Sequence, residues 1–377
     1  MALLRVSKGS AACQSGNVEQ RKLCGIQFPV VFSRKGESIE MKVLVTGGAG
    51  YIGSHTCLAL LELGYDVVAV DNFCNSSPES LKRVEELTGK KVPLYGIDVR
   101  DEAALDRVFK EHEIGCAIHF AGLKAVGESV EKPLAYYENN LLSTMTLLKV
   151  MGKNGVKRII FSSSATVYST ENAMPLNETG RMGCTNPYGW TKFMCEEIIR
   201  DYVKADPAWS AVLLRYFNPV GAHPSGRIGE APNGIPNNLM PFITQTACGV
   251  RKELVVFGND YPTPDGTCVR DYIHVMDLAE GHAAAIDYLM AHTGTEVFNL
   301  GTGQGYSVLD MVKAFEEVNH LTLPHRIGPR RPGDIATCYA DPEKSRQLLH
   351  WTAKRTLRDM CADAWHWQQL NPRGYDA

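Results

Sequence analysis

Short apolar stretches alternate with longer amphipathic ones from residue 41 onward. The short stretches are rich in Val, Ile and Ala and are apolar at nearly every position rather than at every second one. Strands with this pattern are buried on both faces, which is typical of a parallel sheet covered by helices. Because strands and helices alternate regularly, the pattern predicts a doubly wound α/β fold. The predicted strands are 42–46, 66–71, 92–98, 116–122, 158–162 and 210–217.

The character of the sequence changes after residue 217. Residues 218–268 contain seven prolines together with many Gly and Asn residues, a composition typical of loops. Beyond them the pattern predicts a helix over 275–291, a strand over 297–300 and a helix with Ser307 as its N-cap. We therefore expect a sheet domain over 41–217 and a smaller C-terminal α/β substrate domain over 218–377, with some strands and helices crossing between the two.

Residues 1–40 differ from the rest in charge and pattern. They hold six basic residues against three acidic ones and show no sustained apolar period. The first 18 residues lack acidic side chains, so a targeting segment is one interpretation. An extension without ordered structure fits the weak pattern better, and this is the prediction that we adopt.

Charge and cysteine usage narrow the class of protein. The chain has 39 basic and 42 acidic residues, a near-neutral balance that argues against nucleic acid or an anionic membrane as the main partner. No apolar run reaches the length of a transmembrane helix. None of the 11 cysteines forms a closely spaced, zinc-binding pair, so we expect no metal site and favour a reducing, cytoplasmic compartment.

A glycine-rich segment follows the first predicted strand. The sequence from Gly47 to Gly53 reads GGAGYIG, with glycines at Gly47, Gly50 and Gly53, and it leads into a predicted helix. Glycines at this spacing allow a tight turn and a close approach of the backbone to a pyrophosphate. Asp71 ends the second strand, 18 residues past Gly53, where a carboxylate binds ribose hydroxyls and repels a 2′-phosphate. The pattern predicts a Rossmann-type dinucleotide site that prefers NAD to NADP.

One tyrosine is placed for acid–base chemistry. Tyr188 is the only tyrosine followed four residues later by a lysine, Lys192, and this spacing puts both on one helix face. We expect the ammonium of Lys192, with an oxidised nicotinamide, to lower the pKa of the Tyr188 phenol so that it can accept a proton. Ser164 lies at the carboxyl end of the fifth predicted strand, where ligands bind in such sheets. The three residues predict a catalytic centre.

Several longer segments resemble the extended short-chain dehydrogenase/reductase family, and within it the enzymes that epimerise UDP-hexoses at C4. The resemblance covers residues 41–377 and rests on the glycine-rich segment together with 120–129 (FAGLKAVGES), 161–168 (FSSSATVY), 214–224 (LRYFNPVGAHP), 234–241 (GIPNNLMP) and 269–277 (VRDYIHVMD). It implies reversible interconversion of UDP-glucose and UDP-galactose, in galactose metabolism, through a transient 4-keto sugar with bound NAD. Tyr188 would be the acid–base, Ser164 its hydrogen-bonding partner, and Lys192 would hold the nicotinamide ribose.

The resemblance also implies which residues bind the ligands. Implied contacts of NAD, besides the three glycines, are Tyr51, Ile52, Asp71, Asn72, Asn75, Asp98, Val99, Phe120, Lys124, Asn139, Ser164, Tyr188, Lys192 and Tyr216. Implied contacts of the UDP-sugar are Lys124, Ser164, Tyr188, Asn218, Asn238, Leu239, Phe257, Arg270, Tyr272, Arg331, Asp334 and Cys338. Arginines suit a diphosphate, and asparagines suit sugar hydroxyls.

Cys338 bears on substrate range. Family members that accept only sugars without an N-acetyl group resemble one another in carrying a tyrosine at this position. The smaller Cys338 predicts room for an N-acetyl group, and hence activity on UDP-GlcNAc and UDP-GalNAc. The alternative interpretation is that Cys338 is a buried thiol that only packs in the core. Homodimer formation through helices near 133–152 and 187–205 is a further implication of the resemblance.

Two other functions stay open. A nucleotide-sugar 4,6-dehydratase would need a second acid–base pair, and no Asp or Glu stands among Ser164, Ala165 and Thr166. A regulator that binds NAD without turnover would have no need of Tyr188, Lys192 and Ser164 together.

Overall fold

The computed structural model describes residues 20–23, 26–29, 42–331 and 333–376, and the chain divides into two units, Met1–Ile39 and Glu40–Ala377. In the first unit, strands β1 (Gln20–Leu23) and β2 (Ile26–Pro29) form an antiparallel pair. This pair differs from the prediction of an extension without ordered structure over residues 1–40. The rest of that stretch lies outside the described residues.

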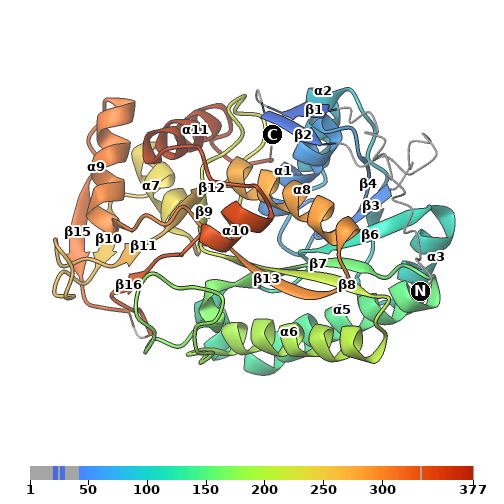
Figure 1. Cartoon of the computed structure of the whole chain (residues 1–377). Helices are drawn as coiled ribbons and strands as arrows, with labels where there is room; N and C mark the ends of the chain where they lie inside the picture. Colours follow the sequence, from blue (N-terminus) through green and yellow to red (C-terminus); the bar gives the residue numbers. More distant parts are fainter. Residues whose placement is uncertain (1–19, 24–25, 30–41, 332, 377) are drawn as a thin grey trace, which may run out of the picture. The chain divides into compact units, whose positions relative to one another are not determined.

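A seven-stranded parallel sheet forms the centre of the second unit, and it confirms the predicted doubly wound α/β class (Figure 1). Its strand order is β13-β8-β7-β6-β3-β4-β5. All seven residues of β8 are buried, as expected for a strand covered on both faces. The strands are β3 (Lys42–Thr46), β4 (Asp66–Asp71), β5 (Leu94–Gly96), β6 (Ile114–His119), β7 (Arg158–Ser164), β8 (Ser210–Tyr216) and β13 (Gly294–Leu300).

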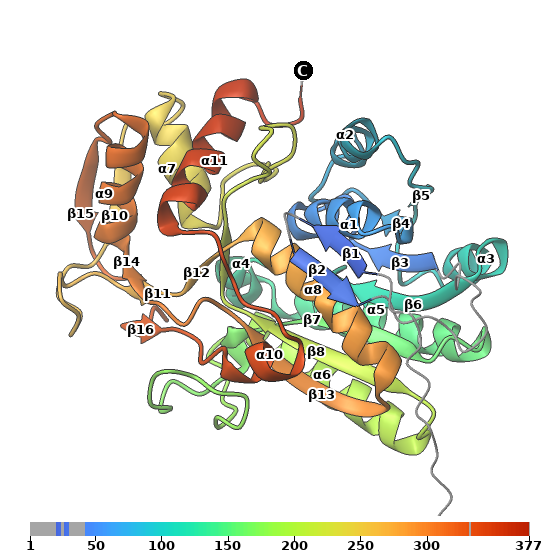
Figure 2. The ribbon, with the colours of Figure 1, turned by 45° about the horizontal axis from the view of Figure 1, so that its top comes forward.

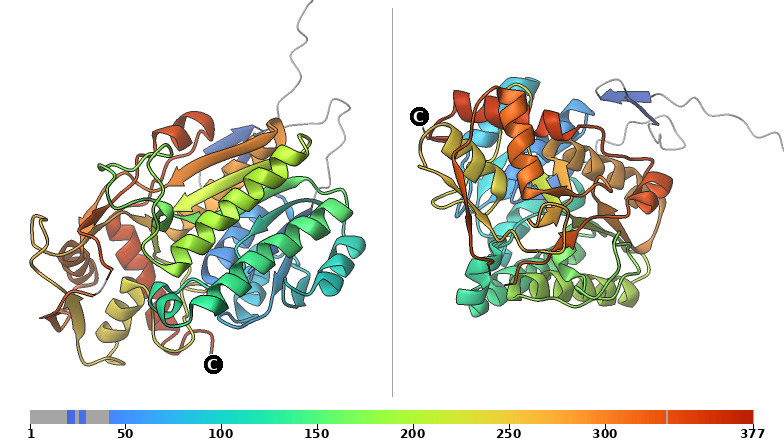
Figure 3. Two further views of the ribbon diagram at one scale, coloured as in Figure 1. Left: turned by 90° about the horizontal axis from the view of Figure 1, so that it is seen from below. Right: turned by 90° about the vertical axis from the view of Figure 1, so that its left-hand side faces the viewer.

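Helices cover both faces of this sheet. On one face lie α1 (Tyr51–Glu62), α2 (Glu79–Thr88) and α8 (Val275–Ala291), and on the other lie α3 (Glu102–Glu111), α5 (Pro133–Lys153) and α6 (Pro187–Ala205). Figure 3 shows α5 and α6 side by side across the second face. Leu44, Ile159 and Leu213 of the sheet pack with Leu147 and Ile199 of these two helices in one apolar cluster.

Two elements of the sheet layer come from beyond residue 217. β13 pairs in parallel with the full length of β8, from Gly294 beside Ser210 to Leu300 beside Tyr216. Helix α8 packs on α1 and on the strands β7 and β8. The 41–217 and 218–377 segments thus share the sheet, and their division into two domains stays a prediction.

Figure 2 shows the remaining C-terminal helices and short strands gathered to one side of the large sheet. Most of them share a second apolar cluster around Val220, Ile243, Phe315, Tyr272 and Met360. Helix α9 (Val308–Asn319) has Ser307 as its N-cap, as predicted, and the Ser307 hydroxyl and the Asp310 carboxylate form a reciprocal capping box. The short sheets order as β10-β15, β14-β11-β16 and β12-β9. Their strands are β9 (Asn218–Val220), β10 (Leu254–Phe257), β11 (Val269–Arg270), β12 (Tyr272–His274), β14 (Tyr306–Ser307), β15 (His325–Gly328) and β16 (Thr337–Cys338).

The other helices are α4 (Val126–Glu131), η1 (Ala165–Val167), α7 (Leu239–Ala247), α9 (Val308–Asn319), α10 (Glu343–Leu348) and α11 (Leu357–Leu370). None of the helices in the described ranges combines the length and apolar character that a membrane crossing requires.

Candidate active site

The glycine-rich turn between β3 and α1 leaves no room for side chains. Gly47 has φ of +69°, and a Cβ there would lie 2.9 Å from the backbone nitrogen of Ala121. A Cβ on Gly53 would lie 2.2 Å from the carbonyl oxygen of Gly47. Helix α1 follows Gly50 without a side-chain cap, so its first backbone N–H groups are available to an anion. The turn therefore fits a pyrophosphate, as the sequence predicted.

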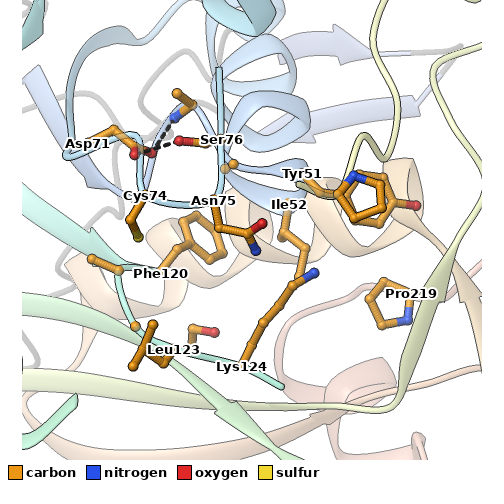
Figure 4. Close-up of a pocket in the computed structure, with 18 of the residues that line it drawn as sticks. Tyr51, Ile52, Asp71, Cys74, Asn75, Ser76, Phe120, Leu123, Lys124 and Pro219 are labelled. Carbon is orange, nitrogen blue, oxygen red and sulfur yellow. Dashed lines mark hydrogen bonds between the residues drawn. The ribbon is translucent and has the colours of Figure 1, made fainter. Parts of the chain in front are cut away.

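The carboxylate of Asp71, at the end of β4, connects the glycine-rich turn to the loop that follows β4. Its carboxylate accepts hydrogen bonds from the backbone N–H of Ala49 at 3.0 Å, from that of Phe73 at 2.9 Å and from the Ser76 hydroxyl at 2.7 Å. Figure 4 shows Asn75 beside this group, with Lys124 extending across the pocket. Asp71 thus ties the cradle to the loop after β4 at the strand end where the sequence placed the ribose.

Asp98 lies at the end of the neighbouring strand and carries a fixed negative charge. Its carboxylate accepts hydrogen bonds from Arg100 Nη2 at 2.7 Å and from Asn72 Nδ2 at 3.1 Å. The Arg100 guanidinium lowers the pKa of Asp98 to about 2. The carboxylate is therefore ionised at neutral pH and suits a hydrogen-bond donor such as an adenine amine.

A cavity of about 320 Å³ runs from this cradle to the carboxyl end of β7. Its lining brings together all of the residues that the resemblance implied for NAD, and five of those implied for the sugar. The lining includes Gly47, Gly50, Tyr51, Ile52, Gly53, Asp71, Asn72, Asn75, Asp98, Val99, Phe120, Lys124, Asn139, Ser164, Tyr188, Lys192, Tyr216, Asn218 and Asn238.

The amino-terminal turn of α6 holds Tyr188 and Lys192 against β7. The Asn186 side chain caps the helix by accepting from the N–H of Gly189 at 2.9 Å, and Pro187 is the first helical residue. Lys192 Nζ donates to the carbonyl oxygen of Ser162 at 2.7 Å and lies 5.9 Å from the centre of the Tyr188 ring. Burial lowers the pKa of Lys192 to about 8.

In the protein alone the pKa of Tyr188 is raised, so its lowering by Lys192 together with an oxidised nicotinamide stays a prediction. Removal of the phenol from water raises its pKa to about 12, and a hydrogen bond with Ser164 offsets only part of that effect. Lys192 directs its ammonium to the Ser162 carbonyl instead. A phenolate at this position therefore needs positive charge from a bound ligand.

A buried ion pair locks α6 to the sheet one turn beyond Lys192. Glu196 is fully buried, and its carboxylate accepts from Arg215 Nε at 2.9 Å, from Arg215 Nη2 at 2.6 Å and from the Ser163 hydroxyl. Ser163 and Arg215 are neighbours on β7 and β8. The lock thus holds the helix that carries Tyr188 against the strand that carries Ser164.

A second cavity, of about 260 Å³, shares Asn218, Pro219 and Asn238 with the first. In its wall, Asp334 accepts from Arg331 Nε at 2.9 Å and lies 3.8 Å from Arg270 Nη2. The other predicted substrate residues that line it are Leu239, Phe257 and Tyr272. Two guanidiniums and an aromatic ring suit a diphosphate and a flat base.

Some findings differ from the sequence-based site. Cys338 is buried in an apolar cluster with Phe217, and it lines neither cavity; its contact with substrate stays a prediction. Glu230 and Tyr375 line the first cavity and Arg251 lines the second, and sequence reasoning singled out none of them. No local motif marks these residues, because they reach the site only through the folding of distant segments.

Comparison with known proteins places this geometry in a family. The family model described as GDP-mannose 4,6 dehydratase matches residues 44–364. UDP-glucose 4-epimerase of Bacillus subtilis is 61% identical over 335 residues, which cover 89% of this chain and 99% of that protein. The mouse enzyme of the same name is 58% identical over 345 residues, or 89% of this chain and 99% of that protein. The chain belongs to the UDP-glucose 4-epimerase family.

A solved structure of the family agrees with the fold. The UDP-glucose 4-epimerase of Bifidobacterium longum, described in complex with NAD+ and UDP, has a TM-score of 0.86 and 58% identity, and the match covers 89% of this chain and 100% of that one. The matching family model carries the name of a dehydratase, but Ala165 and Thr166 follow Ser164 here and bring no carboxyl group to the reacting end. Among the described residues, the carboxylates that line the first cavity are Asp71, Asp98 and Glu230.

Proposed function

We propose that the chain interconverts UDP-glucose and UDP-galactose through a transient 4-keto sugar, with NAD bound in the first cavity. One observation supports this most strongly. Tyr188, Ser164 and Lys192 line the cavity with the glycine cradle, and Ser164 pairs with Tyr216, two residues before Asn218, which lines both cavities. A dinucleotide and a UDP-sugar that fill the two cavities would bring their reactive ends to the same tyrosine.

The chain's own residues manage the proton of the sugar 4-hydroxyl. Bound NAD supplies the acceptor for the hydride that leaves C4 and the donor that returns it. Tyr188 accepts the hydroxyl proton as the carbonyl forms and returns it to the same oxygen afterwards. Ser164 donates a hydrogen bond to that oxygen, and the ammonium of Lys192 adds positive charge 5.9 Å from the phenol ring.

Inversion requires the keto sugar to turn over while the nucleotide stays bound. Arg270 and Arg331 hold the diphosphate in the second cavity. The hexose of the substrate faces the side-chain amides of Asn218 and Asn238, which line both cavities. Rotation about the bond to the diphosphate then presents the opposite face of the ring to the same hydride position. One acid–base on one side of the site thus serves both epimers.

Purified protein incubated with UDP-galactose and no added oxidant should produce UDP-glucose, followed by chromatography. Tyr188→Phe should abolish conversion while the urea unfolding midpoint stays close to that of the unchanged protein, because only a hydroxyl is lost. Conversion by Tyr188→Phe at the normal rate would contradict the role of the phenol. A 4,6-dehydrated product would support the dehydratase function instead.

We further propose that N-acetylated UDP-hexoses are substrates. Cys338 packs beside Phe217, which lines the first cavity, and pairs along β16 with Arg270 of the second. A tyrosine at this position would push these neighbours toward the sugar. Cys338→Tyr should lose activity on UDP-GlcNAc and keep it on UDP-glucose, whereas Cys338→Ser should keep both; equal losses on both sugars would argue for a packing role alone.

We also propose a homodimer through the outer face of α4, α5 and α6. Leu134 and Leu142 of α5 and Trp190 of α6 are among eight large apolar side chains exposed on these helices. An apolar face of this size is typical of a subunit interface. Leu142→Asp should shift the mass measured by light scattering from dimer to monomer, whereas Leu348→Asp, on the distant α10, should not.

A cytoplasmic location is proposed on the chemistry of the thiols. Cys57, Cys116, Cys195 and Cys361 are buried free thiols among the described residues, which suits a reducing compartment. Fractionation of cells that express the full chain, residues 1–40 included, tests this location directly.

A further inference from the structure

Residues 226–233, here called the strap, form one wall of the dinucleotide cavity. The strap lies between β9 and α7, and Gly229, Glu230, Ala231 and Pro232 line the cavity with the glycine cradle. At its end, the backbone N–H of Asn233 donates to Asn75 Oδ1 at 3.4 Å. Asn75 belongs to the loop after β4 that also lines the cavity, so the strap reaches across to the dinucleotide-binding half.

The carboxyl-terminal segment holds the strap from one side. Trp367 Nε1 donates to the Glu230 carbonyl oxygen at 3.2 Å, and the Tyr375 hydroxyl lies 3.2 Å from the backbone nitrogen of Gly229, from which it accepts. The backbone of Gly229 lies directly against the indole, because a Cβ there would be 2.4 Å from the Trp367 ring. Tyr375 itself lines the cavity.

Arg83 of α2 holds the strap and the carboxyl-terminal segment together. Its Nη1 donates to the Arg227 carbonyl oxygen at 3.1 Å and to Asn371 Oδ1 at 2.6 Å. Its guanidinium lies 5.2 Å from the centre of the Tyr375 ring and 5.9 Å from that of Trp367. The Arg83 side chain is only 13% exposed, so these cation–π contacts are partly shielded from water.

We propose that Arg83 and Tyr375 are positioning residues that hold the strap across the dinucleotide cavity and thereby retain NAD between turnovers. The proposal rests on the function given above, because an epimerase returns the hydride to the sugar and gains nothing from releasing its cofactor. Neither residue reaches the reacting end, where Tyr188 and Ser164 lie. Loosening the strap should therefore raise the dissociation rate of NAD. Substitutions at one binding site change affinity mainly through the dissociation rate rather than the association rate.

Retention of NAD is measured directly on the purified full-length protein. Each variant is passed through repeated ultrafiltration, and the NAD that remains bound is extracted and quantified against time. Tyr375→Ala and Arg83→Met should lose NAD about tenfold faster than the unchanged protein. Tyr375→Phe keeps the ring beside Arg83 and removes only the hydroxyl, so its effect should be smaller. Lys82→Met and Asp376→Ala are the matched controls, because both side chains are exposed neighbours that do not contact the strap.

Added NAD separates retention from catalysis. If the strap acts as proposed, excess NAD restores conversion of UDP-galactose by Tyr375→Ala and Arg83→Met, and the urea midpoints show that both variants are folded. Unchanged NAD loss in Tyr375→Ala and Arg83→Met would overturn the proposal, as would a fall in turnover at saturating NAD without faster loss. Failure of the unchanged protein to convert UDP-galactose would refute the epimerase function, whereas the NAD release rates would still report on the strap.

Discussion

Glu196→Gln is the change that should reveal most about how the catalytic helix is held. The substitution keeps the shape of the side chain and removes its charge, so the guanidinium of Arg215, which is 2% exposed, loses its only buried counter-charge among the described residues. Removing one partner of a buried ion pair costs about 3–5 kcal/mol, because the other charge stays desolvated. That is a large part of the roughly 5–15 kcal/mol that stabilises a typical domain.

The same substitution should also affect catalysis through Lys192. Burial lowers the pKa of Lys192, and its neighbours Cys195 and, to a smaller extent, Glu196 on α6 oppose that effect, while His119 faces Lys192 from β6. Loss of the Glu196 charge should lower the Lys192 pKa below about 8, so that the ammonium loses its proton at lower pH. The alkaline fall in kcat should therefore move to lower pH, while KM changes less.

Urea unfolding and the pH profile of kcat test both effects. Glu197→Gln is the matched control, since that carboxylate is exposed and should change stability by less than about 0.5 kcal/mol. The double variant Glu196→Leu/Arg215→Met removes both charges together, so it should lose less stability than Glu196→Gln alone. The reasoning is refuted if the losses of Glu196→Gln and Arg215→Met simply add in a combined variant.

Three further outcomes are expected. Gly53→Ala should lose bound NAD, because its Cβ would lie 2.2 Å from the Gly47 carbonyl oxygen, whereas Gly127→Ala has open space and should bind NAD normally; NAD content after gel filtration distinguishes them. The kcat of the unchanged protein should fall as pH rises through the pKa of Lys192, which is about 8 in the protein alone and lower beside a bound positive charge; stopped assays across pH 6–10 would show this. Asp271→Ala should raise KM for the UDP-sugar, because the carboxylate orders the loop after β13 through a 2.9 Å backbone hydrogen bond; a change in kcat alone would contradict this.

The parts of the fold that depend on local pattern could be predicted from the sequence. The helix expected over 275–291 is observed over those residues, and the strand over 210–217 ends one residue earlier. The glycine cradle and Asp71 were also predictable, since each depends on a turn or a strand end and on fixed spacing. The strand expected over 297–300 begins at Gly294, because its pairing with β8 extends it beyond its apolar core.

The parts that depend on distant contacts could not be predicted. Glu230 and Tyr375 meet the cradle from segments far along the chain, and Arg83 joins them from a helix with an ordinary amphipathic pattern. The rise in the pKa of Tyr188 in the protein alone could not be predicted either, because spacing shows which residues are neighbours and does not show how completely they are removed from water. Burial is a property of the whole fold.

Burial acts on the catalytic pair in opposite directions, and this makes the base conditional on its ligand. The pKa of the phenol of Tyr188 rises to about 12 while that of the ammonium of Lys192 falls to about 8, so in the protein alone Lys192 gives up its proton first. Further positive charge near both groups would lower both pKa values and favour a phenolate. An oxidised nicotinamide carries such a charge and its reduced form does not. Bound NAD in its oxidised form would therefore favour the phenolate of Tyr188, which can accept the hydroxyl proton, and reduction of the nicotinamide would favour the protonated phenol, which can return that proton to the ketone oxygen.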